Sequence, residues 1–336
     1  MRLRAAAWAR IVAAPLLVAA ILWWADPLRV VQEVAGADPA WLLAGLVAAA
    51  LANLVSALRW RMLAVWLGQR IGVAAAAGVY FRAVAISALL PGAIVGGDIY
   101  RAVALNRLGQ PALAAGLSVL LDRLSGLWML LVLGTLAAAW GASDSRLSGL
   151  MPNALQAPGA IAWAGLAACL LVAPVLAMLA LRRLLARGMS GFAPIGPAWR
   201  ERLAAIARQP AAARQYWLQI VASLAVQSLS IGAFALAGRA LGVDLPAWAW
   251  AAAAVPVFLM ATLPVSFGGW GTREAAAVVA LAAFGVPAAP ALGASVLYGL
   301  FALAQALAGG LLIARANARP GDARPGAAAD RTTTRP

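Results

Sequence analysis

Long apolar runs are the feature that most constrains what this chain can fold into. They recur from end to end of the 336 residues, and each is close to the ~20 residues that a helix needs to cross a ~30 Å hydrocarbon core. Hydrophobic residues make up 64% of the chain and charged residues 11%, whereas soluble domains have about 45–50% and about 25%. The sequence therefore predicts an all-α polytopic membrane protein.

Six of the runs predict full transmembrane spans, and they cover residues 11–25, 40–58, 115–140, 160–181, 216–238 and 290–313. Many Trp residues, among them Trp60, Trp140 and Trp217, stand near the ends of these runs. Such clustering is typical of a belt of indole rings at the headgroup level. The first run resembles a signal peptide, but no small-x-small cleavage pattern follows it, so we interpret it as an uncleaved span.

The formal net charge is +15, and all 26 basic residues are Arg. Their distribution favours a membrane topology over nucleic-acid binding. Three Arg precede the first span, seven lie within residues 182–214, and five lie within residues 315–335. Three more, Arg59, Arg61 and Arg70, follow the second span. The positive-inside rule places such segments in the cytoplasm. We therefore predict a cytoplasmic N-terminus (residues 1–10), a membrane domain (residues 11–314) with a basic cytoplasmic loop, and a disordered cytoplasmic tail (residues 315–336).

Residues 73–110 and 247–289 do not have the pattern of simple spans. Each consists of an apolar arm, a Pro, a Gly-rich polar turn and a shorter arm. Because the basic loops fix the side of the membrane before and after, each segment must cross an even number of times. The second arms are too charged or too short to span. Each segment therefore predicts a re-entrant helical hairpin, and two full crossings are the alternative.

The order of segments repeats with opposite orientation. In residues 11–140 the order is span, span, hairpin, span, and it begins on the cytoplasmic side of the membrane. In residues 160–313 the order is the same, but it begins on the outer side. Inverted repeats of this kind are common in secondary transporters, which bind their substrate where broken helices meet near the midplane. The sequence thus predicts six full spans and two hairpins, about eight hydrophobic segments, arranged as an inverted repeat.

The two hairpins carry matching motifs, LPGAIVGGDIYR from residue 90 and LPVSFGGWGTRE from residue 263. Pro interrupts a helix, Gly-Gly lets the backbone turn and approach a ligand, and a helix N-terminus beside an Arg suits an anion such as phosphate. The alternative is that Pro and Gly only break the helices. The candidate hairpin residues are Pro91, Gly96, Gly97, Pro264, Ser266, Gly268, Gly269 and Gly271.

Seven ionisable side chains are predicted at membrane depth and form the candidate substrate-binding set. Each costs about 3 kcal/mol at the centre of a span, so such groups rarely face lipid. Four are positive and three negative, which leaves one positive charge for an anionic ligand. An internal salt-bridge network that pins the hairpins is a compatible interpretation. These residues are Arg82, Asp98, Arg101, Asp122, Arg123, Arg273 and Glu274.

Several kinds of site are excluded by composition. The chain has no His and a single Cys, Cys169. A zinc site lacks its usual ligands, and a Ser-His or Cys-His dyad cannot form. We expect neither a metal nor a cofactor, and we interpret Cys169 as a small packing residue within its apolar run.

Three motifs in order resemble one family, the lysylphosphatidylglycerol synthase transmembrane region, also called the flippase-like domain family. They are the P-x(4)-GGD-x-x-R hairpin, the SVLLDRLSGL segment from Ser118, and the P-x-S-x-GG-x-G-x-R-E hairpin from Pro264. The pair Arg59-Trp60 fits as well, and the resemblance covers about residues 10–315. It implies a bacterial inner-membrane protein related to a domain that flips aminoacylated phosphatidylglycerol. The synthase domain often fused to this region has no counterpart here.

We therefore expect a lipid translocase rather than an enzyme, with membrane lipids as partners and an anionic or phosphate-bearing headgroup bound between the hairpins. One alternative is a non-transporting protein that presents lipid to an envelope-lipid synthase. Another is an intramembrane lipid-modifying enzyme in which Asp98 or Glu274 acts as a base, because burial raises the pKa of a carboxyl group.

Overall fold

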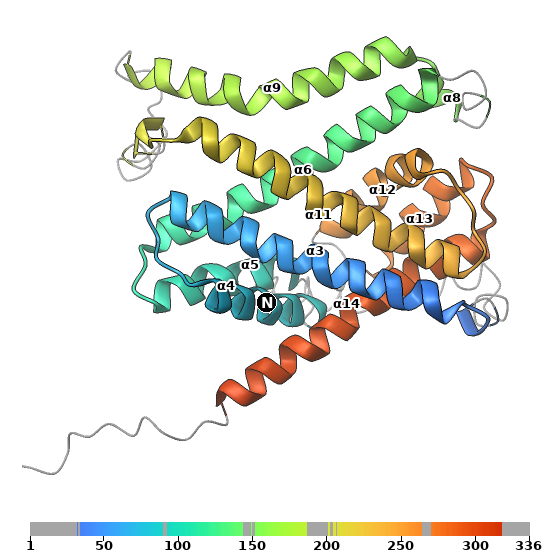
Figure 1. Ribbon diagram of the computed structural model, residues 1–336, viewed down its shortest axis with the longest axis horizontal. Coiled ribbons are helices and arrows are strands. Elements are labelled where there is room, and N and C mark those ends of the chain that lie inside the picture. Colours follow the sequence, from blue (N-terminus) through green and yellow to red (C-terminus); the bar gives the residue numbers. More distant parts are fainter. Residues whose placement is uncertain are drawn as a thin grey trace, which may run out of the picture.

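The computed structural model of the chain describes residues 32, 34–89, 93–143, 149, 152–186, 201, 204–205, 207–263 and 270–317. Helices make up the regular structure of these residues, and no strand is found among them (Figure 1). In chain order they are α3 (Pro39–Trp66), α4 (Val73–Leu89), α5 (Ala93–Arg107), α6 (Ala112–Ser143), α8 (Asn153–Gln156), α9 (Gly159–Ala186), α11 (Ala212–Ala240), α12 (Ala247–Thr262), α13 (Thr272–Ala282) and α14 (Ala288–Asn317).

Five helices within the described ranges are long and apolar enough to cross a membrane, namely α3, α6, α9, α11 and α14. They correspond to five of the six predicted spans and extend beyond them at both ends. α3, for example, begins at Pro39 because the Asp38 side chain accepts a hydrogen bond from the Ala40 backbone N–H at 2.8 Å, which satisfies one free donor of the first turn. The chain is therefore a polytopic membrane protein. The predicted span at residues 11–25, most of the basic loop and nearly all of the tail lie outside the described residues.

The two segments predicted as hairpins each form two short helices. Residues 73–110 contain α4 (17 residues) and α5 (15 residues), and residues 247–289 contain α12 (16 residues) and α13 (11 residues). Each helix is shorter than the ~20 residues of a full crossing. Within each segment the two helices pack against each other, so the predicted division into two arms is observed.

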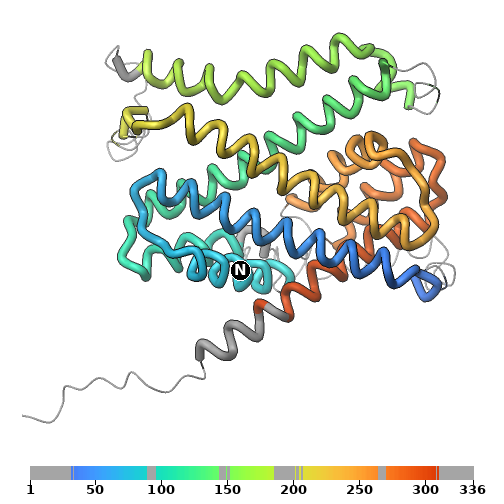
Figure 2. Tube along the Cα trace, in the orientation of Figure 1, coloured from blue at the N-terminus to red at the C-terminus, as the bar shows by residue number. Residues whose placement is uncertain are grey.

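The helices are arranged around a central pair, α3 and α11, which lie side by side and run in opposite directions (Figures 1 and 2). The α4–α5 pair lies at the C-terminal end of α3, and the α12–α13 pair lies at the C-terminal end of α11 (Figure 1). The contacts of the two pairs are reciprocal: α4 packs on α14 and α5 on α6, whereas α12 packs on α6 and α13 on α14.

Glycines permit the closest of these crossings. Gly309 of α14 lies against the backbone oxygen of Phe81 in α4, and Gly134 of α6 lies against the side chain of Val255 in α12. A methyl group at either position would collide with the facing helix. Small residues at helix crossings let membrane helices gain packing contacts that lipid cannot supply.

Trp60 and Cys169 lie elsewhere than expected. Two other Trp residues, Trp140 and Trp217, are 67% and 64% exposed, as residues of an interfacial belt are. Trp60 is instead fully buried, and its indole N–H donates to the Ser118 hydroxyl at 3.2 Å, so the belt interpretation is wrong for this residue. Cys169 is exposed on α9 rather than packed inside.

Candidate functional site

Five charged side chains form an alternating row through the first half of the membrane domain. We call this row, Arg59–Asp122–Arg101–Asp98–Arg123, the charge chain. Asp122 accepts from Arg59 Nε at 2.9 Å on Oδ1 and from Arg101 Nη1 at 2.7 Å on Oδ2. Asp98 accepts from Arg101 Nη2 at 2.6 Å and from Arg123 Nε at 2.7 Å. Each carboxylate is thus shared by two Arg residues, and three Arg against two Asp leave one net positive charge.

Three helices position the charge chain. Arg59 comes from α3, and Asp122 and Arg123 come from α6. Asp98 and Arg101 lie on α5 at positions i and i+3, which share one face of a helix. The charge chain therefore connects α5, the second arm of the first hairpin segment, to the two long helices α3 and α6.

Arg101 is the central member and is enclosed on its faces as well as its edges. Its guanidinium carbon lies 5.4 Å from the centre of the Trp60 ring and 5.0 Å from that of Tyr80. Cations at this distance are attracted by the ring quadrupole. Nη1 and Nη2 each donate to one carboxylate, so Arg101 bridges Asp122 and Asp98.

Burial falls from one end of the charge chain to the other. The side chains of Arg59, Arg101 and Asp122 are 5%, 3% and 2% exposed, whereas those of Asp98 and Arg123 are 22% and 39% exposed. Nε of Arg123 donates to Asp98, and its two terminal nitrogens donate to no residue within the described ranges. The excess positive charge is therefore accessible at the Arg123 end.

A second polar group, which we call the tip cluster, lies where α13 begins. Arg273 donates to Glu274 Oε1 through Nη2 at 2.5 Å and to the Ser295 hydroxyl through Nε at 3.2 Å. Glu274 Oε2 accepts from the Gly271 backbone N–H at 2.6 Å. Gly271 has φ of +89°, a conformation that favours glycine. The tip cluster is neutral and buried, and it caps α13 while joining it to α14.

The Arg of the tip cluster is enclosed much as Arg101 is. The centres of the Trp270 and Tyr298 rings lie 4.9 Å and 5.9 Å from the guanidinium carbon of Arg273. Gly299 of α14 makes room for it, because a methyl group there would collide with Arg273 Nη2. Within the described residues no ion pair or hydrogen bond joins the tip cluster to the charge chain, so the predicted candidate residues form two groups.

The remaining predicted residues have different surroundings. Arg82 of α4 is half-buried, and its Nε has no hydrogen-bond partner within the described part of the chain. Gly96 and Gly97 lie inside α5 rather than in a turn. Gly97 faces the Ala83 backbone oxygen and the Ser87 hydroxyl of α4, so the close approach that it permits is between the two arms. The positions outside the described residues are Pro91, Pro264, Ser266, Gly268 and Gly269.

One member of the charge chain was not predicted. The pattern of basic residues assigned Arg59 to a cytoplasmic loop, but α3 continues to Trp66 and Arg59 is 4% exposed. Arg59 Nη1 also donates to the Ser223 hydroxyl of α11 at 3.2 Å. The signal available was the acidic Asp122 in an apolar run, because a buried carboxylate needs hydrogen bonds beyond those of a single ion pair.

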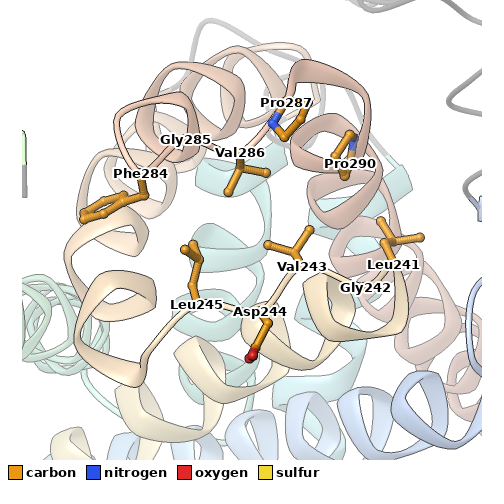
Figure 3. Close-up of a pocket in the computed structure, with 10 residues that line it drawn as sticks. All are labelled: Leu241, Gly242, Val243, Asp244, Leu245, Phe284, Gly285, Val286, Pro287 and Pro290. Atoms are coloured by element: carbon orange, nitrogen blue, oxygen red, sulfur yellow. The ribbon is translucent and has the colours of Figure 1, made fainter. Parts of the chain in front are cut away.

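A hollow of about 280 Å³ lies beyond the C-terminal end of α11, between the α11–α12 and α13–α14 connections (Figure 3). It is lined mainly by apolar side chains and backbone, and Asp244 is its one charged residue. None of the predicted site residues lines it. Within the described ranges no group of His, Cys, Asp and Glu is suited to hold a metal ion.

Comparison with known families agrees with this architecture. A family model described as the lysylphosphatidylglycerol synthase TM region matches residues 11–310, which is most of the chain. The chain therefore belongs to this family, and it is a membrane protein related to lipid metabolism or transport. No curated protein matches it.

Proposed function

We propose that this member of the lysylphosphatidylglycerol synthase transmembrane family is a bacterial inner-membrane lipid translocase that binds an anionic headgroup at Arg123. The observation that carries the proposal is the graded burial of the charge chain, whose one excess positive charge is accessible at one end. The terminal nitrogens of Arg123 supply a planar fork that matches the oxygens of a phosphate. The acyl chains of the bound lipid stay in the bilayer.

Two halves of opposite orientation form the translocase in this proposal. The reciprocal packing of α4 on α14 and of α12 on α6 supports it. So do the matching glycine contacts, Gly309 against Phe81 and Gly134 against Val255. In an inverted repeat each contact recurs with the two halves exchanged, which is the pattern of both observations.

The two short helix pairs enter the membrane from opposite sides in this arrangement. Their positions at opposite ends of α3 and α11 support this (Figure 1), as do their lengths. The positive-inside rule puts the connection between α5 and α6 in the cytoplasm together with both termini. The charge chain is then approached from the cytoplasmic half of the protein.

Asp98 gives the headgroup site its orientation. It accepts from Arg123 Nε and from Arg101 Nη2, so it holds the Arg123 guanidinium by one edge and leaves the other edge for the ligand. A phosphate oxygen at that edge forms charge-assisted hydrogen bonds, which are about twice as strong as neutral ones. Arg82, whose buried Nε has no partner within the described residues, lies in the same half.

The described carboxylates favour transport or presentation over chemistry. Asp98, Asp122 and Glu274 each accept from at least one Arg, and Glu274 also holds the Gly271 N–H. A general base must lie within hydrogen-bond reach of the proton that it takes, and every oxygen of these three groups already accepts from a protein donor. A non-transporting protein that presents lipid to an envelope-lipid synthase uses the same headgroup site, and a transport measurement separates it from a translocase.

Native mass spectrometry of lipids that co-purify with the protein tests the headgroup site. The variants are Arg123→Gln and, as a control, Arg183→Gln, which removes an exposed Arg from the end of α9. We expect Arg123→Gln to weaken retention of an anionic phospholipid by about 10- to 100-fold, because hydrogen bonds to charged groups contribute about 1.5–3 kcal/mol. We expect Arg183→Gln to retain it. Equal retention by both variants would remove Arg123 from the site.

A further inference from the structure

Four polar side chains follow one another along α11 at every fourth position: Gln215, Gln219, Ser223 and Gln227. We call them the polar stripe. Positions four apart lie on nearly the same face of a helix. The Ser223 hydroxyl accepts from Arg59 Nη1 at 3.2 Å, and Gln227 Nε2 donates to the Gly126 backbone oxygen at 2.8 Å. The stripe therefore leads to the deep end of the charge chain.

Three amide atoms of Gln215 and Gln219, the two members nearest the start of α11, are buried and have no partner in the described residues. Gln215 and Gln219 are each 8% exposed. Neither the amide nitrogen nor the amide oxygen of Gln219, nor the amide nitrogen of Gln215, has a hydrogen-bond partner in the described part of the chain. Buried polar groups in proteins are bonded to protein or to water in the great majority of cases. Two adjacent turns of α11 thus present unused donors and an unused acceptor to the interior.

Lipid does not satisfy these amides. The opposite face of α11 is the one that faces outward, since Trp217 and Val221 are 64% and 65% exposed. The stripe faces inward, where Ser223 meets α3 and Gln227 meets α6. A polar interior site of this kind is where water enters a protein, each molecule making about three hydrogen bonds.

We propose that the polar stripe lines a narrow hydrated path that admits water and small hydrophilic anions from the beginning of α11 to the Arg59–Asp122 pair. The path opens beside Arg214, which is exposed at the start of the helix. At its inner end the path reaches Ser223, whose hydroxyl accepts a hydrogen bond from Arg59. Together with the charge chain it forms a polar route whose other end is the accessible Arg123. This inference concerns access of water and does not depend on lipid transport.

Reaction of introduced cysteines tests the path. Cys169 is first replaced by Ala, and single cysteines are then placed by Gln219→Cys and Gln215→Cys. Two controls lie away from the stripe: Ala254→Cys, in the apolar core around α12 where Ala254 is fully buried, and Val221→Cys on the outward face of α11, where Val221 is 65% exposed. The reagent is sulfonatoethyl methanethiosulfonate, a membrane-impermeant anion, applied to inside-out membrane vesicles.

We expect Gln219→Cys and Gln215→Cys to react about tenfold faster or more than both controls, because only a hydrated thiol ionises to the reactive thiolate. Rates at both stripe positions equal to that of Ala254→Cys would overturn the path. If Gln219→Cys does not fold, as judged by size-exclusion chromatography, Gln215→Cys decides the test against the same controls.

A second measurement examines the inner end of the path. Ser223→Cys should react with the same reagent, and adding Gln219→Phe should slow that reaction about tenfold by filling the route one turn away. An unchanged rate in the double variant would contradict a path that runs along the stripe. The Val221→Phe substitution, on the lipid-facing side, is the matched control for the added ring.

Discussion

Arg59 and Asp122 are 63 residues apart in the sequence and are joined by two hydrogen bonds, one to the carboxylate and one to the backbone. Nε donates to Oδ1 at 2.9 Å, and Nη2 donates to the Asp122 main-chain oxygen at 3.1 Å. The second bond fixes the crossing of α3 and α6 as well as the charge. The other carboxylate oxygen is taken by Arg101, so one acid holds three helices together.

Replacing Asp122 by Asn should therefore destabilise the fold. Among the described residues it leaves the buried Arg59 without an ion-pair partner and Arg101 with Asp98 alone, and breaking a buried ion pair by removing one member costs about 3–5 kcal/mol. We expect a clearly lower midpoint of thermal unfolding in detergent. The control is Asp244→Asn, since Asp244 is 91% exposed and lies 3.7 Å from Arg239. Equal midpoints would show that the charge chain does not hold the helices.

Replacing Gly97 by Ala should force the two arms of the first hairpin segment apart. The new methyl group would lie 2.7 Å from the Ala83 backbone oxygen, which cannot rotate away as a side chain can. Overpacking of this kind costs about 1–3 kcal/mol. Gly78→Ala in α4, where nothing lies within 4 Å, is the control and should be neutral or slightly stabilising. Equal thermal midpoints for the two variants would contradict the tight α4–α5 packing.

Substitutions in the tip cluster should lower the stability of the fold to different extents. Glu274→Gln removes the charge that faces Arg273, and we expect a loss of about 3–5 kcal/mol. Ser295→Ala removes one hydroxyl that accepts from Arg273 at 3.2 Å, and we expect a loss of about 1 kcal/mol. Thermal unfolding of both variants in detergent measures the difference. A larger effect from Ser295→Ala would reverse our assignment of Glu274 as the partner that stabilises Arg273.

Opposite orientation of the two halves predicts opposite labelling of two exposed sites. In the Cys169→Ala background, Asn106→Cys near the end of α5 should react with an impermeant thiol reagent from the cytoplasmic side. Asp244→Cys, between α11 and α12, should react from the outer side. Both positions are exposed. Labelling of both from the same side would exclude the inverted repeat.

Much of the fold follows from hydropathy and helix-breaking residues alone. The runs at residues 115–140 and 216–238 correspond to α6 (Ala112–Ser143) and α11 (Ala212–Ala240). Hydropathy marks only the apolar part of each helix, whereas backbone hydrogen bonding continues into the flanking residues. The division of residues 73–110 and 247–289 into two arms was also predictable, because the sequence interrupts each with Pro and Gly.

The site was predictable only in part. Asp98, Arg101, Asp122 and Arg123 stand out because charges in apolar runs are costly, and these four are linked in the charge chain. Arg59 was missed because a single Arg near the end of a span has the same pattern whether it snorkels to the surface or pairs inside. Gly97 was misread because close approach to a ligand and close approach to another helix both require glycine.

The central claim is that anionic lipid moves across the bilayer by way of Arg123, and a transport assay tests it most directly. Proteoliposomes containing a fluorescently labelled anionic phospholipid are treated with dithionite, which quenches only the outer leaflet. We expect the wild-type protein and Arg183→Gln to expose the inner-leaflet lipid to quenching, and Arg123→Gln to slow this about tenfold or more. Lipid that stays protected with the wild-type protein would contradict transport and favour a lipid-presenting role. Equal rates for wild type and Arg123→Gln would contradict the assigned headgroup site.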